Sequence, residues 1–141
     1  MTSRVLIMGL PGSGKTTLAK KIFQLLECRN LKVIWINADK IRKEYNDWDF
    51  STEGRIRQSR RIRDLADKIE CDYVIADFVA PLQEMRDIFS ADFTVWVDTI
   101  AEGRFEDTNK AFVKPILYDF KVSTQEAEYW GNVITYMLLT K

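Results

Sequence analysis

The sequence predicts an α/β fold in which helices cover both faces of a parallel sheet of about five strands. Three observations indicate this fold. Short apolar runs rich in β-branched residues alternate with longer segments of helical periodicity along the chain. A glycine-rich segment joins the first apolar run to the first helical segment. The length of 141 residues, of which 46% are hydrophobic and 30% charged, is typical of one domain, which we expect to span residues 1–141.

The apolar runs are interpreted as strands because each is short and combines β-branched or aromatic residues with polar or charged flanks. Five runs meet this description: 4–8, 32–36, 73–76, 93–97 and 118–122. Helical patterns fill several of the gaps between them. Parallel strands need such crossovers, and crossovers cover the sheet, so the alternation favours parallel pairing.

Two helices are predicted from residues that fall on one face at helical spacing. The first begins near Lys15 and buries Leu18, Ile22, Leu25 and Leu26; the second buries Ile62, Leu65, Ala66 and Ile69. Near the end of the chain, Ser123 lies three residues before Glu126, a spacing that predicts a capping box at the start of a terminal helix. That helix would carry Trp130, Val133, Ile134 and Met137.

Three segments fall outside this scheme: 39–52, 77–85 and 103–114. Each follows the carboxyl end of a predicted strand, and ligands bind at that edge of open α/β sheets. We therefore expect the functional residues in these segments.

Composition excludes several classes of function. The 21 basic residues balance the 21 acidic ones, so the total charge attracts neither nucleic acid nor a membrane surface, and neither is expected as a partner. The absence of histidine excludes imidazole bases and histidine-ligated zinc. Cys28 and Cys71 are too few for a disulfide scaffold. With no signal peptide evident and no uncharged stretch longer than residues 129–140, we expect a cytoplasmic protein.

Residues 9–16 match GxxxxGK[ST], the phosphate-binding loop, directly between a predicted strand and a predicted helix. Backbone N–H groups of such a loop surround the nucleotide's phosphates, and the motif therefore predicts the three-layer fold of P-loop NTPases and kinases with ATP and Mg²⁺ bound. We expect Lys15 to act in catalysis and Thr16 to ligate Mg²⁺. The expected nucleotide-binding residues are Gly9, Pro11, Gly12, Ser13, Gly14, Lys15, Thr16 and Thr17. The alternative is a glycine-rich turn with a solvated lysine.

Two carboxylates follow strands beside this loop. Asp39, after the second strand, is expected to orient an attacking hydroxyl and to help hold Mg²⁺; the alternative is a helix N-cap. Asp77, after the third strand, is expected to reach Mg²⁺ through water, as a Walker-B carboxylate does. Its alternative is a simple strand terminator.

Five of the nine residues 55–63 are arginines. At helical spacing they cannot all point one way, so only a subset can serve one site. We expect Arg55, Gln58 and Arg60 to face a small anionic acceptor. The alternatives are a solvated helix face and a nucleic-acid-binding ridge.

Read in order, these segments resemble adenylylsulfate kinase, which phosphorylates the ribose 3′-hydroxyl of adenosine 5′-phosphosulfate with MgATP. GLPGSGKTTLA is similar to that family's GLSGSGKST, and NADKIR at 37–42 to its DGDNVR. Phe50 and Ser51 followed by Arg55, Gln58 and Arg60 resemble its FSPEDRNENIRR. FVAP at 78–81 with Arg86 resembles FISPYxxxR, and Val97, Asp98, Thr99 and Glu102 resemble VDTPLE.

The resemblance, over about residues 4–102, implies roles in the acceptor site. Arg42, Arg55 and Gln58 would contact the phosphosulfate and ribose of a small nucleotide acceptor, with Asp39 at its hydroxyl. Phe50 and Phe112 would clamp its adenine, and Phe78 and Val79 would line the pocket. In the lid, Arg104 would contact the donor nucleotide and Lys110 the acceptor. A homodimer is left open.

The sequence also departs from the family pattern. Gln58 replaces Asn, Ala80 replaces Ser, Asp77 replaces a small residue, and Glu106 stands where a lid arginine is expected. Only Arg104 and Lys110 remain as basic lid residues, and both could be solvated loop charges. Two other functions therefore stay open: a related kinase with a different nucleotide or small-molecule acceptor, and a nucleotide-dependent nucleic-acid-binding module, which zero net charge disfavours.

Overall fold

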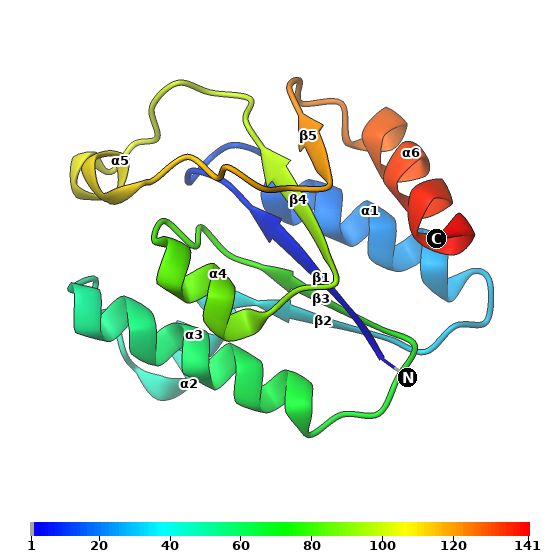
Figure 1. Ribbon diagram of the computed structural model, residues 1–141, viewed down its shortest axis with the longest axis horizontal. Coiled ribbons are helices and arrows are strands. Elements are labelled where there is room, and N and C mark those ends of the chain that lie inside the picture. Colours follow the sequence, from blue (N-terminus) through cyan, green and yellow to red (C-terminus); the bar gives the residue numbers. More distant parts are fainter. Residues whose placement is uncertain (1) are drawn as a thin grey trace.

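A computed structural model describes residues 2–141 as one twisted sheet between two layers of helices (Figure 1). The strands are β1 (Ser3–Met8), β2 (Val33–Asn37), β3 (Tyr73–Asp77), β4 (Phe93–Val97) and β5 (Phe120–Val122). The helices are α1 (Lys15–Glu27), α2 (Ala38–Tyr45), α3 (Thr52–Asp67), α4 (Gln83–Phe89), α5 (Glu106–Ala111) and α6 (Ala127–Thr140).

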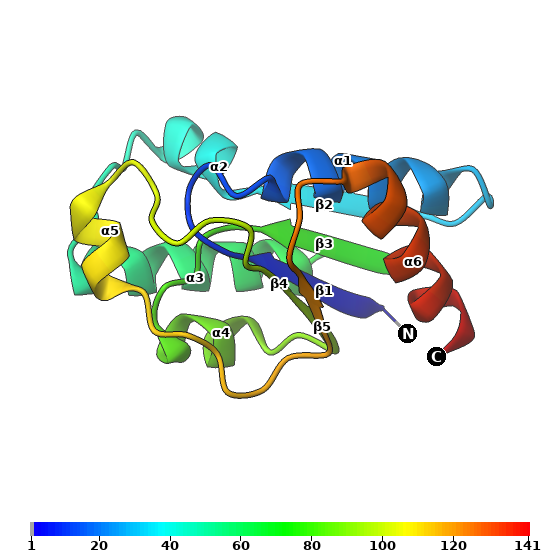
Figure 2. The ribbon, with the colours of Figure 1, turned by 90° about the horizontal axis from the view of Figure 1, so that it is seen from above.

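The strand order is β2-β3-β1-β4-β5, and every pair is parallel. Residues of β1 alternate between two cores: Leu6 and Met8 belong to the cluster with α3 and α4, whereas Val5 and Ile7 belong to the cluster with α1 and α6. Figure 2 shows these helix pairs on opposite sides of the sheet. The predicted α/β fold with a parallel five-stranded sheet is thus confirmed.

The carboxyl ends of β1, β2, β3 and β4 all lead to one edge of the sheet, where the phosphate loop, α2 and the segment before α5 lie (Figure 1). The three segments that the periodicity left unassigned contain short helices at this edge: α2, the start of α4, and α5. Their brevity explains why no periodic pattern revealed them.

The predicted capping box at Ser123 and Glu126 is wrong. Helix α6 begins at Ala127, and Glu126 occupies the cap position without a side-chain capping bond. Instead the Thr124 hydroxyl donates to the Glu126 carboxylate at 2.6 Å and accepts from the Trp130 indole at 2.8 Å. The fifth strand is also shorter than predicted, since Tyr118 lies outside it and packs edge to face on Trp96.

Within residues 2–141, no helix is both long enough and apolar enough to cross a membrane.

Candidate active site

The phosphate loop turns from the end of β1 into α1 at the predicted position. Gly14 immediately precedes the helix with φ of 102°, a left-handed conformation that glycine adopts without strain. A Cβ atom on Gly9 would collide with the Val97 carbonyl oxygen, so the loop also needs glycine where it passes β4. The N–H groups of the first turn of α1 consequently face the space above the sheet edge.

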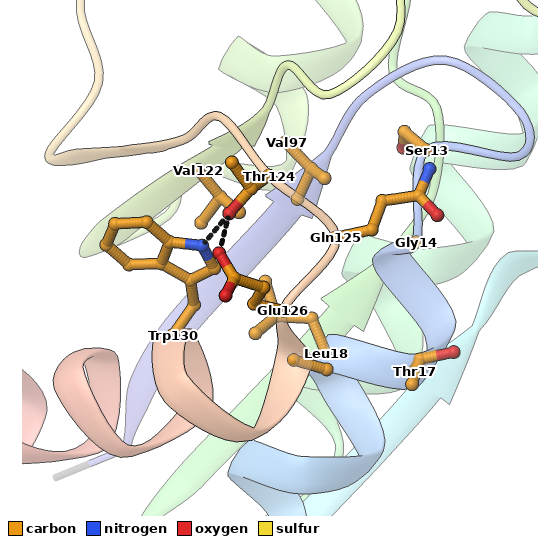
Figure 3. A pocket seen from close by; sticks show the side chains of 11 residues that line it. Ser13, Gly14, Thr17, Leu18, Val97, Val122, Thr124, Gln125, Glu126 and Trp130 are labelled. Carbon is orange, nitrogen blue, oxygen red and sulfur yellow. Dashed lines mark hydrogen bonds between the residues drawn. The ribbon is translucent and has the colours of Figure 1, made fainter.

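Two polar side chains from elsewhere brace this loop. The Thr99 hydroxyl donates to the Ser13 carbonyl at 2.6 Å. The Gln125 amide donates to the Gly12 carbonyl at 3.2 Å and to Thr99 Oγ1 at 3.3 Å. Figure 3 shows Gln125 reaching toward the loop from the segment between β5 and α6. Sequence reasoning missed Gln125, because its approach depends on where α6 packs.

A cavity of about 100 Å³ lies between the phosphate loop and the start of α6 (Figure 3). It is lined by Ser13, Gly14, Thr17, Leu18, Val97, Val122, Thr124, Gln125, Glu126, Ala127 and Trp130. The predicted nucleotide-binding residues Ser13, Gly14 and Thr17 therefore share a hollow with residues that no motif indicated.

Lys15 is only 8% exposed, and its Nζ donates to the Leu10 carbonyl at 3.0 Å. Burial lowers the pKa of Lys15, and the neighbouring Arg104 lowers it further, whereas the charges of Asp77 and Asp39 raise it. The charges of Asp39, Asp77 and Arg104 therefore all act on Lys15. The fold brings these four residues together from separate segments of the chain.

Asp77 is 3% exposed and lies against Thr16. Its Oδ2 atom accepts hydrogen bonds from the Thr16 hydroxyl and from the Asn37 amide, each at 3.0 Å. Burial raises the pKa of Asp77, whereas Lys15 and the two hydrogen bonds lower it.

These oxygen atoms suit Mg²⁺, which prefers hydroxyl, carboxylate, phosphate and water ligands. Residues 2–141 contain no cluster of three or more acidic, histidine or cysteine side chains that could hold a metal by themselves. A magnesium ion here would therefore take part of its coordination from nucleotide phosphates and water, as is usual for nucleotide-bound Mg²⁺.

Asp39 occupies the first turn of α2 and is exposed. The alternative interpretation of Asp39 as the helix cap is wrong, because Asn37 caps α2 by accepting from the Lys40 N–H at 3.1 Å. The carboxylate of Asp39 is consequently available to a ligand at the sheet edge.

An arginine-rich wall stands next to this carboxylate. Arg42 is 6% exposed; it donates to the carbonyls of Asp47 at 3.1 Å and Asp49 at 3.2 Å, and its guanidinium lies 4.3 Å from the Phe50 ring centre. Arg55 donates to the Phe50 carbonyl at 2.8 Å. Phe50 itself is 52% exposed. Arg42, Phe50 and Arg55 are thus brought together, as the resemblance implied.

The other predicted acceptor residues vary in exposure. Gln58 is 2% exposed, and its amide donates to the Ala38 carbonyl at 2.8 Å, while its Oε1 atom has no partner. Phe78 is buried edge to face against Phe89 in the core, so its side chain supports the site from below. Val79 is half-buried, and Phe112 is half-buried against the same core.

Three of the remaining arginines of α3 are paired with carboxylates. Arg57 and Arg61 both pair with Asp47, at 2.8 and 2.7 Å, and Arg63 pairs with Asp64 at 3.0 Å. Arg60, predicted to face the acceptor, is exposed on the helix. Because three of these cations are already paired, the helix offers little free charge to a nucleic-acid backbone.

The lid is formed by Gly103 and α5. The Asn109 side chain accepts from the Gly103 N–H at 2.7 Å and donates to its carbonyl at 2.9 Å, which closes the segment into a compact turn. Glu106 and Lys110 are exposed and pair with each other at 3.4 Å. Of the two basic lid candidates, Arg104 is thus the one whose charge reaches Lys15.

Arg86 connects the segment that follows the lid helix to the turn at Ala80 and Pro81, a role that the sequence analysis did not assign. Its guanidinium donates to the carbonyls of Ala80 at 2.8 Å and Pro81 at 3.2 Å, and to that of Val113 beyond the lid helix. It also lies 5.4 Å from the Phe112 ring centre. Burial lowers the pKa of Arg86 to about 10.

Comparison with known proteins shows the family of the chain. The family model described as adenylylsulphate kinase matches residues 1–109. An adenylyl-sulfate kinase of Bacillus velezensis is 33% identical over 111 residues, which are 77% of this chain and 51% of the relative. A probable adenylyl-sulfate kinase of Aeropyrum pernix is 33% identical over 87 residues, 60% of this chain and 48% of the relative. The chain thus spans about half the length of these curated relatives.

Solved structures show the same fold. The structure of the Mycobacterium tuberculosis APS kinase in complex with AMPPNP and APS has a TM-score of 0.81 at 19% identity, covering 99% of this chain and 98% of that one. Shikimate kinase from Acinetobacter baumannii in complex with shikimate has a TM-score of 0.67 at 15% identity, covering 99% and 94%.

Proposed function

The chain belongs to the adenylylsulfate kinase family, and on this premise we propose that it transfers the γ-phosphoryl group of ATP to the 3′-hydroxyl of adenosine 5′-phosphosulfate. The observation that carries the proposal is the juxtaposition of a phosphate loop with an aromatic and arginine wall. Lys15 lies within electrostatic reach of Asp39, Asp77 and Arg104. Arg42 begins the wall three residues after Asp39, in the same short helix.

On the donor side, the loop amides and Lys15 would bind the β- and γ-phosphates, with Arg104 above them. Lys15 now bonds a backbone carbonyl, so nucleotide binding would exchange that neutral acceptor for phosphate oxygens of opposite charge. Thr16 and Asp77 would hold Mg²⁺, which neutralises charge on the transferring group when bound. A local cluster of positive charge is needed because the net charge of the chain is zero.

On the acceptor side, Arg42 and Arg55 would bind the anionic phosphosulfate. Each guanidinium has several N–H donors, and the carbonyl bonds use only part of them. Phe50 and Phe112 would stack on the adenine ring. Their positions differ in exposure, which suits a clamp with one fixed wall, Phe112, and one accessible wall, Phe50.

In the transfer step, the acceptor's 3′-oxygen would attack the γ-phosphorus while the bond from that phosphorus to the β–γ bridging oxygen breaks. The proton of the hydroxyl passes to Asp39 and then to solvent, and ADP leaves. Asp39 suits this role because it is exposed beside the phosphate loop and is free of the capping bond.

A cytoplasmic location is part of the proposal, since Cys28 and Cys71 are both free thiols, which suits a reducing compartment. The acceptor is proposed as a small nucleotide, and homodimer formation is compatible with it.

The test is formation of 3′-phosphoadenosine 5′-phosphosulfate from MgATP and adenosine 5′-phosphosulfate, followed by chromatography. We expect product and ADP in equal amounts. The Gly9→Ala variant, whose added Cβ would collide with β4, should be inactive and would serve as the loop control. Binding of ATP without product from this acceptor would instead support the related kinase with a different acceptor, which the replacement of a lid arginine by Glu106 favours.

A further inference from the structure

Asn37 and Asp77 form a hydrogen-bonded pair at the carboxyl ends of two neighbouring strands. They are register partners in the parallel pairing of β2 with β3, so they occupy equivalent positions on adjacent strands. The Asn37 amide donates to Asp77 Oδ2 at 3.0 Å. Thr16 lies beside both, with its hydroxyl 3.0 Å from Asp77 Oδ2 and 3.4 Å from the Asn37 amide nitrogen.

The orientation of the Asn37 side chain is determined by a second bond. Its oxygen accepts the Lys40 N–H at 3.1 Å and so caps α2. Because an oxygen must face that N–H, the amide NH₂ is directed to the other side, toward Asp77. The capping bond therefore aims a hydrogen-bond donor at the buried carboxylate.

Asp77 needs such a donor. It is 3% exposed, and a carboxylate at this depth loses most of its hydration. The Asn37 amide and the Thr16 hydroxyl replace part of that hydration, because each donates a hydrogen bond to Asp77 Oδ2 at 3.0 Å.

We propose that Asn37 is a positioning residue for the Asp77 carboxylate, and that the carboxylate and the amide can be exchanged between these two register positions. The inference rests on the proposed function only in that Asp77 serves a nucleotide-bound Mg²⁺. It assigns a role to Asn37 that neither the motifs nor the acidic residues alone indicate.

The exchange is chemically balanced. An aspartate at position 37 can accept the Lys40 N–H, since Asp caps helices as well as Asn does. An asparagine at position 77 can donate to that carboxylate across the same 3.0 Å gap. Thr16 lies close enough to position 37 to reach a carboxylate there. The double variant thus keeps the charge, the cap and the hydrogen bond.

The experiment uses four variants: Asn37→Ser, Asn37→Asp, Asp77→Asn and the double variant Asn37→Asp/Asp77→Asn. Calorimetry measures ADP affinity with Mg²⁺ and with EDTA, and the ratio of the two affinities gives the Mg²⁺ enhancement. A thermal melt of each nucleotide-free protein provides a readout independent of the metal.

We expect Asp77→Asn to lose at least about 10-fold of the Mg²⁺ enhancement, and Asn37→Ser, which can still cap α2, to lose several-fold with little change in melting temperature. The double variant should recover most of the enhancement that Asp77→Asn loses. Asn37→Asp should melt lower than the double variant, because two carboxylates would then face each other.

The matched control is Asp72→Asn, which changes a carboxylate to an amide at the opposite end of the same strand pair. Asp72 accepts the Lys32 N–H at 2.7 Å, so this variant should lose stability but keep the enhancement. The inference is overturned if Asn37→Ser keeps full enhancement, if the folded double variant stays as low as Asp77→Asn, or if the unmodified protein shows no enhancement. Enhanced ADP binding without phosphorylation of the acceptor would contradict only the proposed function.

Discussion

At the scale of single residues, Lys15 is the side chain on which the charge balance of the site depends. It is 8% exposed and bonds a carbonyl oxygen, while two carboxylates and one arginine act on it through space. A cation held this way lacks a directly bonded anion, and phosphate oxygens would supply one. Its burial costs folding free energy that nucleotide binding can offset.

Lys15→Ala should therefore reduce kcat for phosphoryl transfer by at least about 100-fold, because a preorganised cation at developing charge is lost. The melting temperature of the free protein should not fall, since the variant removes a desolvated charge. Turnover and thermal melting measure the two effects. Lys20→Ala, on an exposed face of α1, is the control. Full turnover in folded Lys15→Ala would exclude the catalytic role.

Asp39→Asn should lower kcat by about 100-fold or more, because the amide cannot accept the hydroxyl proton. The melting temperature should be nearly unchanged, since Asn37 and not Asp39 caps α2. Turnover and a thermal melt of the variant and the unmodified protein test this pair of expectations. A loss of stability with unchanged kcat would mean that Asp39 has a structural role instead.

At the scale of elements, the segment between α2 and α3 is organised by arginines. Arg42 binds the carbonyls of Asp47 and Asp49, and the Asp47 carboxylate accepts from Arg57 at 2.8 and 3.1 Å and from Arg61 at 2.7 Å. Arg61 also stacks 4.2 Å from the Tyr45 ring centre. Phe50 lies in this segment, so these ion pairs support the proposed acceptor wall.

These hydrogen bonds hold the pKa of Asp47 well below its ordinary value. The unfolded chain then binds more protons than the native one below about pH 4, so the free energy of unfolding falls as pH falls through that range. Asp47→Asn should unfold more easily at neutral pH and show a shallower decrease between about pH 5 and 3. Urea midpoints at several pH values test this, with Asp64→Asn as control. If the urea midpoints of Asp47→Asn and of the unmodified protein fell in parallel with pH, the expectation would be contradicted.

The strands and the phosphate loop could be predicted because their determinants are local. Short apolar runs rich in β-branched residues and a glycine motif specify backbone conformation within a few residues. The long-range contacts of Gln125 and Arg86 could not be predicted in this way. Gln125 reaches the loop only after α6 packs on α1, and Arg86 reaches the Val113 carbonyl only after the segment beyond α5 returns to Pro81.

A similar limit applies within the site. Arginine side chains bind both anions and backbone carbonyls. The sequence therefore predicted a shared site for Arg42 and Arg55 but not the carbonyl groups that each of them contacts. The start of α6 was missed because a serine and a glutamate at capping-box spacing also occur in loops, and Thr124 competed for the same glutamate.

At the scale of the whole molecule, the proposed donor and acceptor sites meet at one edge of the sheet and share the lid. Arg86 links the Ala80 turn, the Pro81 carbonyl and Val113, and Arg55 contacts Thr108 in α5 at 3.4 Å. The lid thus contacts Arg55 of the proposed acceptor wall through Thr108. It also acts on Lys15 of the phosphate loop through the charge of Arg104. Binding of ATP and binding of the acceptor should consequently be coupled through the lid. The phosphate loop would select the donor, and the wall of Arg42, Phe50 and Arg55 would select the acceptor.

This separation leads to a prediction about acceptor choice. With saturating MgATP, we expect adenosine 5′-phosphosulfate to give the highest kcat/KM in a panel with AMP, other nucleoside monophosphates and a 5′-hydroxyl oligonucleotide. The arginines of the wall favour an acceptor with anionic groups, and Phe50 and Phe112 favour one with a purine. Phe50→Ala should raise the KM for this acceptor by about 10-fold, which corresponds to a stacking contact of about 1.4 kcal/mol, and leave the KM for ATP unchanged.

Tyr136→Ala provides the control, because Tyr136 is an aromatic residue 70% exposed on α6, a helix that packs on α1 at the other face of the sheet. A higher kcat/KM for another member of the panel would assign the wall to that acceptor while leaving the donor site as described. If Phe50→Ala raised the KM for ATP as much as the KM for the acceptor, Phe50 would not be specific to the acceptor wall. The segment that carries Phe50 would then act on both substrates through the lid that they share.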